Sequence, residues 1–243
     1  MTGHSAVIIG VGPEQGLGAT LATFFAGKGL HVFIAGRSED KLQTVAEKIR
    51  QTGGAATPVV ADATVGEDVA HLFDVVQSQG FGVDIAAYNV DSNIPSPLLE
   101  TDTGTFTKLW QQNCLGAFLF GKEAIKQMQP QQFGTLFFTG ATASLRAKPP
   151  FTAFAAAKAG LRALAQGLAR EFSPQGIHVV HTIIDGVIDG DRARSQFPAY
   201  VEAKGEEGLL QLDAIAQTYW AIHQQHPSAW THELDLRPFK EPF

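Results

Sequence analysis

The chain has 243 residues, of which 44% are hydrophobic and 17% charged, and its 18 basic and 24 acidic side chains give a formal net charge of −6. Such a chain is not expected to bind nucleic acid, whose affinity depends on Lys and Arg meeting phosphates, or an anionic membrane surface. The single cysteine, Cys114, excludes an intrachain disulfide framework and a multi-cysteine metal site, and no metal is predicted. Because the sequence shows neither a signal-peptide pattern nor an apolar stretch of ~18 residues, we expect a cytoplasmic protein without a membrane span.

Short apolar segments alternate with longer helical patterns along the chain. Strands are predicted at Ser5–Val11, His31–Ala35, Thr57–Ala61, Val83–Val90, Gly134–Thr139, Ile177–Ile184 and Ala229–Leu236. Helices are predicted at Leu17–Gly29, Glu39–Gly53, Val65–Gln79, Thr103–Gln129, Phe151–Phe172 and Leu209–Gln225. The strands are nearly continuous in apolar residues, as strands covered on both faces must be. The alternation predicts an α/β Rossmann fold, a single domain over residues 1–243 with a doubly wound, parallel, seven-stranded sheet and helices on both faces.

A glycine-rich turn joins the first predicted strand to the first helix. Gly12, Gly16, Leu17 and Gly18 lie in a G-x3-G-x-G spacing. Glycines let the backbone turn and approach a pyrophosphate closely, and the following helix N-terminus supplies partial positive charge. The position of the turn, inside a βαβ unit, favours a dinucleotide site over a tight turn that binds nothing.

The residues after the second strand indicate which dinucleotide is bound. Gly36 stands where an NAD site usually carries the acid that binds the ribose 2′-hydroxyl, and Arg37 and Ser38 follow it. A guanidinium can hold a 2′-phosphate through two charge-assisted hydrogen bonds. We therefore predict that NADP(H) is preferred over NAD(H). The alternative is that Arg37 is a solvated residue at the start of a surface helix.

These motifs together resemble the short-chain dehydrogenase/reductase family over essentially the full length of the chain. The glycine turn matches the family's T-G-x-x-x-G-x-G pattern, with Val11 in place of the threonine. By this resemblance, Asp62 is the acid that contacts the adenine ring, and Asn113 is the active-site asparagine. Of the family's N-N-A-G segment only Asn89 is kept. In the turn after the sixth strand Gly186 is kept as a cofactor contact, while the usual proline is lost.

The resemblance also has implications for the segment after the sixth strand and for assembly. Residues 185–206 are polar and rich in glycine and charge, and they correspond to the mobile loop that covers the substrate in the family. The helices Thr103–Gln129 and Phe151–Phe172 correspond to those that pair between subunits, so a homodimer or homotetramer is expected.

The family's catalytic Y-x-x-x-K pair is only half present. Lys158 is kept, but Phe154 stands at the tyrosine position, and Ala141 stands at the serine position thirteen residues before it. The resemblance implies that Lys158 and Asn113 keep their roles, whereas a phenyl ring and a methyl group can neither donate nor accept a proton. Losing a positioned acid or base costs about 10²–10⁴ in rate, but hydride transfer itself needs only the cofactor and a placed substrate.

Three residues near the same sheet edge could replace the missing hydroxyls. Thr142 lies next to Ala141, Tyr88 ends the fourth strand, and Asp185 follows the sixth. Each also has a structural explanation, which we favour: Thr142 as a loop hydrogen-bonder, Tyr88 as pocket lining and Asp185 as a turn or cap residue.

Three functions are compatible with this pattern. The first is an NADP(H)-dependent oxidoreductase with an altered proton route that acts on a small, apolar substrate. The second is a non-catalytic NADP(H)-binding sensor or partner-binding protein, which the loss of the tyrosine and serine favours directly. The third is a structural relative that binds no nucleotide.

Overall fold

The computed structural model describes residues 3–241 and contains a seven-stranded parallel sheet with the strand order β3-β2-β1-β4-β5-β6-β7. The order reverses between β1 and β4, which confirms the predicted doubly wound topology. The strands are β1 (Gly3–Ile9), β2 (His31–Gly36), β3 (Ala55–Val60), β4 (Phe81–Tyr88), β5 (Gly134–Thr139), β6 (Ile177–Ile184) and β7 (Glu233–Leu236).

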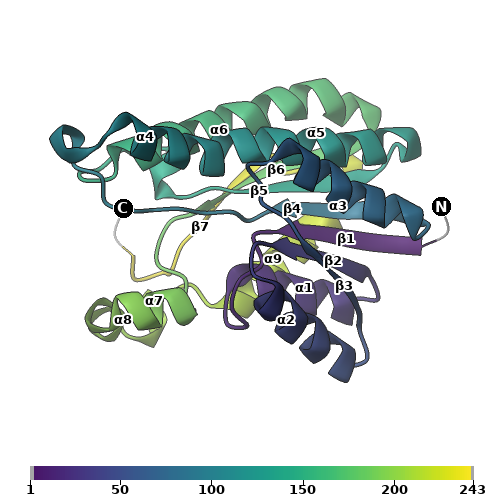
Figure 1. Ribbon diagram of the computed structural model, residues 1–243, viewed down its shortest axis with the longest axis horizontal. Coiled ribbons are helices and arrows are strands. Elements are labelled where there is room, and N and C mark those ends of the chain that lie inside the picture. The colour runs from purple at the N-terminus through teal and green to yellow at the C-terminus, as the bar shows by residue number, and fades with distance from the viewer. Residues whose placement is uncertain (1–2, 242–243) are drawn as a thin grey trace.

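Helices cover both faces of the sheet, with α1, α2 and α9 on one side and α3, α4, α5 and α6 on the other (Figure 1). Their bounds are α1 (Leu17–Gly27), α2 (Glu39–Gln51), α3 (Gly66–Ser78), α4 (Thr103–Trp110), α5 (Gly116–Met128), α6 (Thr152–Phe172), α7 (Asp191–Gln196), α8 (Pro198–Lys204) and α9 (Leu212–His223). Single 3₁₀ turns lie at Leu98–Glu100, Gln129–Gln131, Thr142–Ser144, Ser173–Gln175, Glu206–Gly208 and Pro227–Ala229. Within residues 3–241, no helix combines the length and apolar character needed to cross a membrane.

Successive residues of each strand belong to two different hydrophobic cores. Ile8 and Ile34 pack in the core beneath α1, α2 and α9, whereas Ile9 and Phe33 pack in the core beneath α3, α5 and α6. Side chains alternate across a strand, so a strand with helices on both faces needs apolar residues at nearly every position. This explains the continuous apolar runs of the sequence.

The predicted helix Thr103–Gln129 is interrupted by a π-helical turn at Gln111–Leu115, which separates α4 from α5. Asn113 lies in this turn, and its Nδ2 donates hydrogen bonds to the carbonyls of Leu109 (3.0 Å) and Ser92 (3.3 Å). Periodicity did not reveal the interruption, because the residues at both ends of the π turn keep right-handed helical backbone angles. Such turns often mark functional sites.

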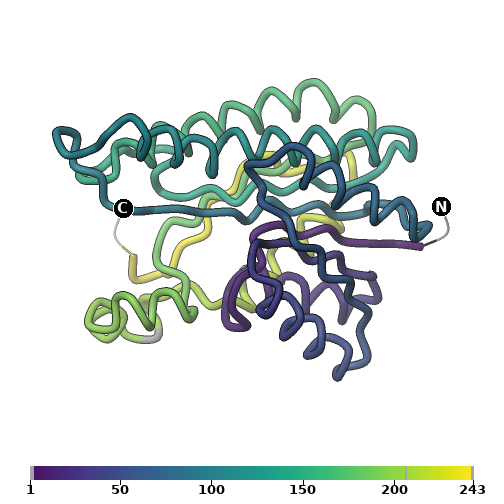
Figure 2. The backbone as a smooth tube through the Cα atoms, in the orientation of Figure 1, coloured from purple at the N-terminus to yellow at the C-terminus, as the bar shows by residue number. Residues whose placement is uncertain are grey.

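Residues 185–206, predicted to be a loop or a small mobile element, contain the helices α7 and α8. Figure 2 shows these two helices beyond the carboxyl ends of the strands, apart from the main helical layers. The start of α7 is fixed to the glycine turn, because the Asp191 amide donates to the Gln15 carbonyl at 2.9 Å. A Cβ on Gly190 would lie 2.6 Å from the same oxygen, so only glycine allows this close approach.

Candidate functional site

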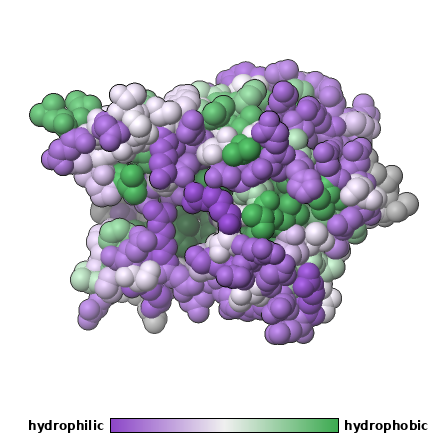
Figure 3. Space-filling view, in the orientation of Figure 1, coloured by the Kyte–Doolittle hydropathy of each residue, from purple (hydrophilic) through white to green (hydrophobic). Residues whose placement is uncertain are grey.

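The residues predicted to form the site gather at the carboxyl ends of the strands. The glycine turn follows β1, Arg37 follows β2, Asp62 follows β3 and Asp91 follows β4. Open α/β sheets bind ligands at this edge, where the strand order reverses. Figure 3 shows that the surface is hollowed here, between the layer that contains α4 and the helices α7 and α8. We call this hollow the cleft.

The glycine turn brings α1 directly against the end of β1. A Cβ on Gly18 would lie 2.8 Å from the Gly10 carbonyl oxygen, whereas a Cβ on Gly12 would meet nothing within 4 Å. Gly16 precedes α1 and provides no side-chain cap, so the first N–H groups of the helix have no side-chain partner there. An open turn and uncapped amides fit an anionic diphosphate.

The end of β2 excludes the acid of an NAD site for steric reasons. A Cβ on Gly36 would lie 2.5 Å from the Val11 carbonyl oxygen. Arg37 and Ser38 follow and are exposed. Burial acts to raise the pKa of the Asp62 carboxyl, but hydrogen bonds from Thr64 and the charge of Arg37 outweigh it, and the pKa is lowered. Asp62 is therefore ionised near Arg37.

Lys158, on α6, is fully buried, with 1% of its side chain exposed. Its ammonium donates to the Thr139 carbonyl at 3.0 Å and lies 3.3 Å from the Asp91 carboxylate. The ammonium is also 5.7 Å from the centre of the Phe154 ring, which is buried. Ala141 is half-buried at the start of the turn after β5. Neither Phe154 nor Ala141 offers a proton at this point of the cleft.

Asp91 also belongs to the site. Its only signal in the sequence is that it departs from the family's N-N-A-G segment. Its Oδ1 faces Lys158, and its Oδ2 lies 3.3 Å from Arg192 on α7. Arg192 also donates to Asn93. Residues of α6 and α7 therefore meet at one carboxylate, in the loop after β4.

Asp185 and Thr142 lie together, but neither is a free proton donor. The Thr142 hydroxyl donates to Asp185 Oδ1 at 2.5 Å, and Arg146 and Arg237 donate to Oδ2 at 2.7 and 2.6 Å. Burial acts to raise the pKa of Asp185, but these hydrogen bonds and the two guanidinium charges lower it. The carboxylate anchors the turn after β5 and the segment after β7 to the end of β6.

Tyr88 does not line a pocket, which corrects the prediction favoured for it, and it is not a candidate proton donor either. Its side chain is fully buried in the core beneath α3, α5 and α6. Its hydroxyl donates to the Gln112 carbonyl at 2.5 Å, in the π turn. Burial raises the pKa of the phenol far above its ordinary value. Tyr88 thus supports the π turn and does not line a pocket.

The remaining predicted contacts lie close to the backbone of the same edge. The Asn89 amide donates to the Ile9 carbonyl at 2.9 Å, and its Nδ2 lies 3.5 Å from the Gly10 carbonyl. Gly186 has a φ of +154°, and a Cβ there would lie 2.9 Å from Pro238. Asn113 Oδ1 is buried and has no partner within the described chain, so it is available to a water or a ligand. Residues 3–241 hold no cluster of side chains suited to a metal.

A partly buried triad of ionisable side chains lies behind the end of β5, and no motif pointed to it. His181 Nδ1 contacts Glu233 at 2.9 Å, and Arg162 binds the same carboxylate through two hydrogen bonds at 2.7 and 2.8 Å. Burial lowers the pKa of His181 to about 4, although the Glu233 hydrogen bond opposes it. The Arg162 hydrogen bonds lower the pKa of Glu233 to about 2. The neutral ring therefore carries its proton on Nδ1, and Nε2 faces Gly140.

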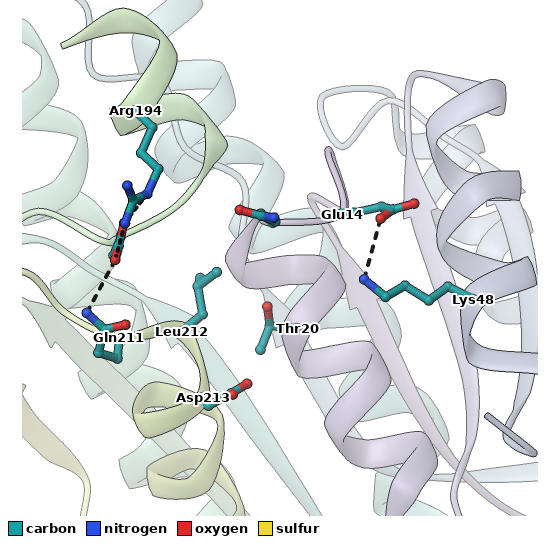
Figure 4. A pocket seen from close by; sticks show the side chains of 9 residues that line it. Glu14, Thr20, Lys48, Arg194, Gln211, Leu212 and Asp213 are labelled. Carbon is teal, nitrogen blue, oxygen red and sulfur yellow. Dashed lines mark hydrogen bonds and ion pairs between the residues drawn. The ribbon is translucent and has the colours of Figure 1, made fainter. Parts of the chain in front are cut away.

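A separate pocket of about 500 Å³ lies beside the glycine turn, between α1, α2, α7 and the start of α9. Figure 4 shows Lys48 paired with Glu14 on one wall and Arg194 on the other. Arg194 forms an ion pair with Asp189 at 2.6 Å. It contains none of the predicted cofactor residues, so it is not the cleft described above.

Comparison with known proteins agrees with this architecture. Residues 6–200 match the sequence model of the family described as short chain dehydrogenase. The crystal structure of a short-chain dehydrogenase from Rhodopseudomonas palustris is 35% identical, with a TM-score of 0.83, and the similarity covers 97% of this chain and 99% of that one. A short-chain dehydrogenase/reductase of Hericium erinaceus is 34% identical over 177 residues, 70% of each chain. An uncharacterized oxidoreductase of Staphylococcus aureus is 28% identical over 189 residues, 78% of this chain and 80% of the relative.

The family match begins in β1 and continues through the glycine turn, Asp62, Asn113 and Lys158 to α8. The fold, the strand order and the cleft all agree with it. The chain therefore belongs to the short-chain dehydrogenase family, oxidoreductases that use a nicotinamide cofactor to act on small molecules.

Proposed function

We propose that this protein is an NADP(H)-dependent oxidoreductase that acts on a small, largely apolar substrate by a proton route different from that of its family. The observation that carries the cofactor preference is the end of β2. A carboxylate side chain does not fit at Gly36, whose Cβ position is 2.5 Å from a carbonyl oxygen, and exposed Arg37 follows it. A 2′-phosphate would there meet a guanidinium and no competing acid.

The residues of the cleft fit the rest of the cofactor. The open turn at Gly12 and the uncapped start of α1 would hold the diphosphate. Asp62 would meet the adenine, and the pair formed by Asp91 and Lys158 would lie beside the other ribose. When bound, the nicotinamide supplies or accepts the hydride. Among solved structures of similar fold, an actinorhodin polyketide ketoreductase was determined with NADPH and a metagenomic short-chain oxidoreductase with NADP.

The substrate end of the cleft supports an apolar substrate that takes its proton from water. Phe154 and Ala141 replace the hydroxyl groups, and the ionised carboxylate of Asp185 already accepts three hydrogen bonds. Segments that border the cleft carry exposed apolar side chains: Ile94, Leu145 and Phe197 are 43%, 46% and 53% exposed. Activated C=C or C=N bonds and quinones suit such a site, because water can protonate the reduced product.

A thermal-shift titration tests the cofactor preference, because a ligand that binds only the folded state raises stability with its concentration over Kd. We expect a larger shift with NADP(H) than with NAD(H). Arg37→Ala should weaken NADP(H) binding about 10–100-fold, the value of one or two charged hydrogen bonds, and should remove the difference. Arg170→Ala, an exposed arginine in the last turn of α6, is the matched control. Equal shifts for the two cofactors in the wild-type protein would refute the preference.

The second candidate function is a non-catalytic NADP(H)-binding protein, which Phe154 and Ala141 favour. Turnover distinguishes it from the first. NADPH consumption with a panel of carbonyl, enone, imine and quinone substrates supports the enzyme, whereas tight binding without turnover of any class supports the sensor.

We also propose that copies of the chain associate through α4, α5 and α6. Phe106 and Trp110 on α4 and Phe118 on α5 are 45%, 40% and 46% exposed, which is unusual for large apolar side chains on neighbouring helical turns. Light scattering at micromolar concentration should give a dimer or tetramer, and a monomer would contradict this.

A further inference from the structure

The ammonium of Lys158 is buried, and two of its three N–H groups are directed to acceptors of the protein. An ammonium carries three N–H groups. One is bonded to the Thr139 carbonyl at 3.0 Å, one is directed to Asp91 Oδ1 at 3.3 Å, and the remaining side of the group faces the Phe154 ring at 5.7 Å. With 1% of its side chain exposed, Lys158 is a buried cation that needs its counter-ion. It does not reach the surface of the cleft.

The exposed member of this pair is Asp91, with 34% of its side chain accessible. A carboxylate has about four acceptor positions. Asp91 uses one toward Lys158 and one toward Arg192, both at 3.3 Å. The other acceptor positions remain open to a donor in the cleft. Arg192 is itself 44% exposed and belongs to the short helix α7, so it can move without disturbing the sheet.

Asp91 lies in the loop after β4, and the contacts of its neighbour Asn89 fix the start of this loop. The preceding Asn89 bonds the end of β1 through its amide and approaches the Gly10 carbonyl, next to the glycine turn. Gly10 allows this contact, because a Cβ there would lie 2.6 Å from the Asn89 carbonyl carbon and oxygen. The Asp91 carboxylate therefore lies between the glycine turn and Lys158 on α6, where the proposed cofactor would run from its diphosphate to the nicotinamide.

We propose that Asp91, supported by Lys158, accepts hydrogen bonds from the two hydroxyls of the ribose next to the nicotinamide, an inference that rests on the proposed cofactor. A ribose diol offers two O–H donors, and O–H···O⁻ bonds are among the stronger hydrogen bonds. Asp91 is then the residue that contacts the cofactor, and Lys158 is a positioning residue that fixes the carboxylate. The protein group that contacts this ribose is then a carboxylate, which accepts hydrogen bonds, and not an ammonium, which donates them.

Calorimetric titration with two ligands tests this assignment. NADP⁺ contains the nicotinamide ribose, whereas 2′,5′-ADP carries the adenosine and the 2′-phosphate but lacks that ribose. Asp91→Asn keeps the size of the side chain and removes its charge. We expect it to weaken NADP⁺ binding at least ten-fold and to leave the Kd of 2′,5′-ADP within two-fold. Asp74→Asn, on the exposed face of α3, makes the same charge change away from the cleft and should alter neither.

Two further variants separate a direct contact from indirect effects. Arg192→Gln removes the ion pair between Asp91 and α7 but keeps the Asp91 carboxylate, so NADP⁺ binding should be retained. In a Lys158→Met background, Asp91→Asn should still weaken NADP⁺, because the carboxylate itself makes the contact. If Asp91 acts only as the counter-ion of Lys158, Asp91→Asn has no effect in that background, and the inference is wrong.

The outcomes also separate this inference from the proposed function. Unchanged or tighter NADP⁺ binding by Asp91→Asn, with normal 2′,5′-ADP binding, would overturn the role of Asp91 and leave the cofactor preference intact. A wild-type protein that binds neither ligand would overturn the proposed function and this inference with it. Binding of 2′,5′-ADP by every variant shows that the glycine turn and Arg37 region remain folded.

Discussion

The two ends of the cleft are built in different ways. The first, here called the adenosine end, consists of the glycine turn, Arg37 and Asp62, and it depends on backbone shape: Gly18 and Gly36 leave no space for a side chain. The second, the nicotinamide end, consists of Asp91, Ala141, Phe154, Lys158 and Asp185. Here the family's hydroxyls are absent, and buried or half-buried charges pair with one another.

In the proposed function, this difference separates the residues that would bind the cofactor from those that would take part in the chemistry. Backbone approach at a turn tolerates few replacements, because any Cβ at Gly18 collides with the carbonyl of Gly10. Side chains that only move a proton can be replaced without changing the fold, as Phe154 and Ala141 show. We therefore expect added side-chain bulk to disrupt the adenosine end, and changes of charge or pH to affect the nicotinamide end.

The largest expected effect is at the adenosine end. Gly18→Val places atoms 2.8 Å from the Gly10 carbonyl oxygen and 3.0 Å from Val11 Cα. Overpacking of this kind against backbone should cost about 3 kcal/mol of unfolding free energy and abolish NADP(H) binding. Urea unfolding and a binding titration measure the two effects.

Gly12→Ala is the control, because its Cβ meets nothing within 4 Å. Its unfolding free energy should change by less than about 0.5 kcal/mol, while cofactor affinity falls, since the methyl group enters the space for the diphosphate. A Gly18→Val protein as stable as the wild type would show that shape does not define this end.

The next effect is the pH dependence of stability near the nicotinamide end. Burial lowers the pKa of His181 to about 4, against 6.5 for an unperturbed histidine. As pH falls below 6.5, the unfolded chain binds a proton that the folded ring refuses, so stability decreases until about pH 4. Between pH 7.5 and 5 this removes about 2 kcal/mol. Glu233, with its pKa lowered to about 2, extends the loss in the same direction at lower pH.

His181→Gln should remove this part of the loss, which urea unfolding at pH 7.5 and pH 5 can measure. Exposed His226→Gln is the matched control and should keep the wild-type pH dependence. If the two variants lose the same stability between these pH values, His181 does not contribute as described.

The sheet could be predicted from the sequence because its evidence is local. Each strand is an apolar run bounded by glycine or polar residues, and the glycine turn predicts the position of the cleft. The interruption at Gln111–Leu115 could not be predicted in this way, since it arises when Asn113 bonds the Leu109 and Ser92 carbonyls and Tyr88 bonds Gln112. These contacts join β4 to the helical layer and depend on tertiary packing.

The ion pairs of the site could not be predicted from the sequence either. Asp91 and Arg192 are 101 residues apart, and His181 and Glu233 are 52 apart. No motif links them, and only the fold brings them together. The departure of Asp91 from N-N-A-G was the one available signal. Tyr88 was misjudged for a related reason: the residue that ends a strand can face either layer, and its neighbours, not its position, decide that it packs in the core.

The smallest expected effect is a gain of function at the nicotinamide end. Phe154→Tyr with Ala141→Ser restores a phenol four residues before Lys158 and a hydroxyl beside it. Lys158 already lies 5.7 Å from the Phe154 ring centre, and a nearby cation lowers the pKa of a phenol. At saturating NADPH, carbonyl reduction should rise about ten-fold, equivalent to about 1.4 kcal/mol. If the wild-type protein already reduces a substrate and Phe154→Tyr slows that reaction, Phe154 is part of a working apolar pocket, and the nicotinamide end has been reshaped for a substrate that needs no phenol.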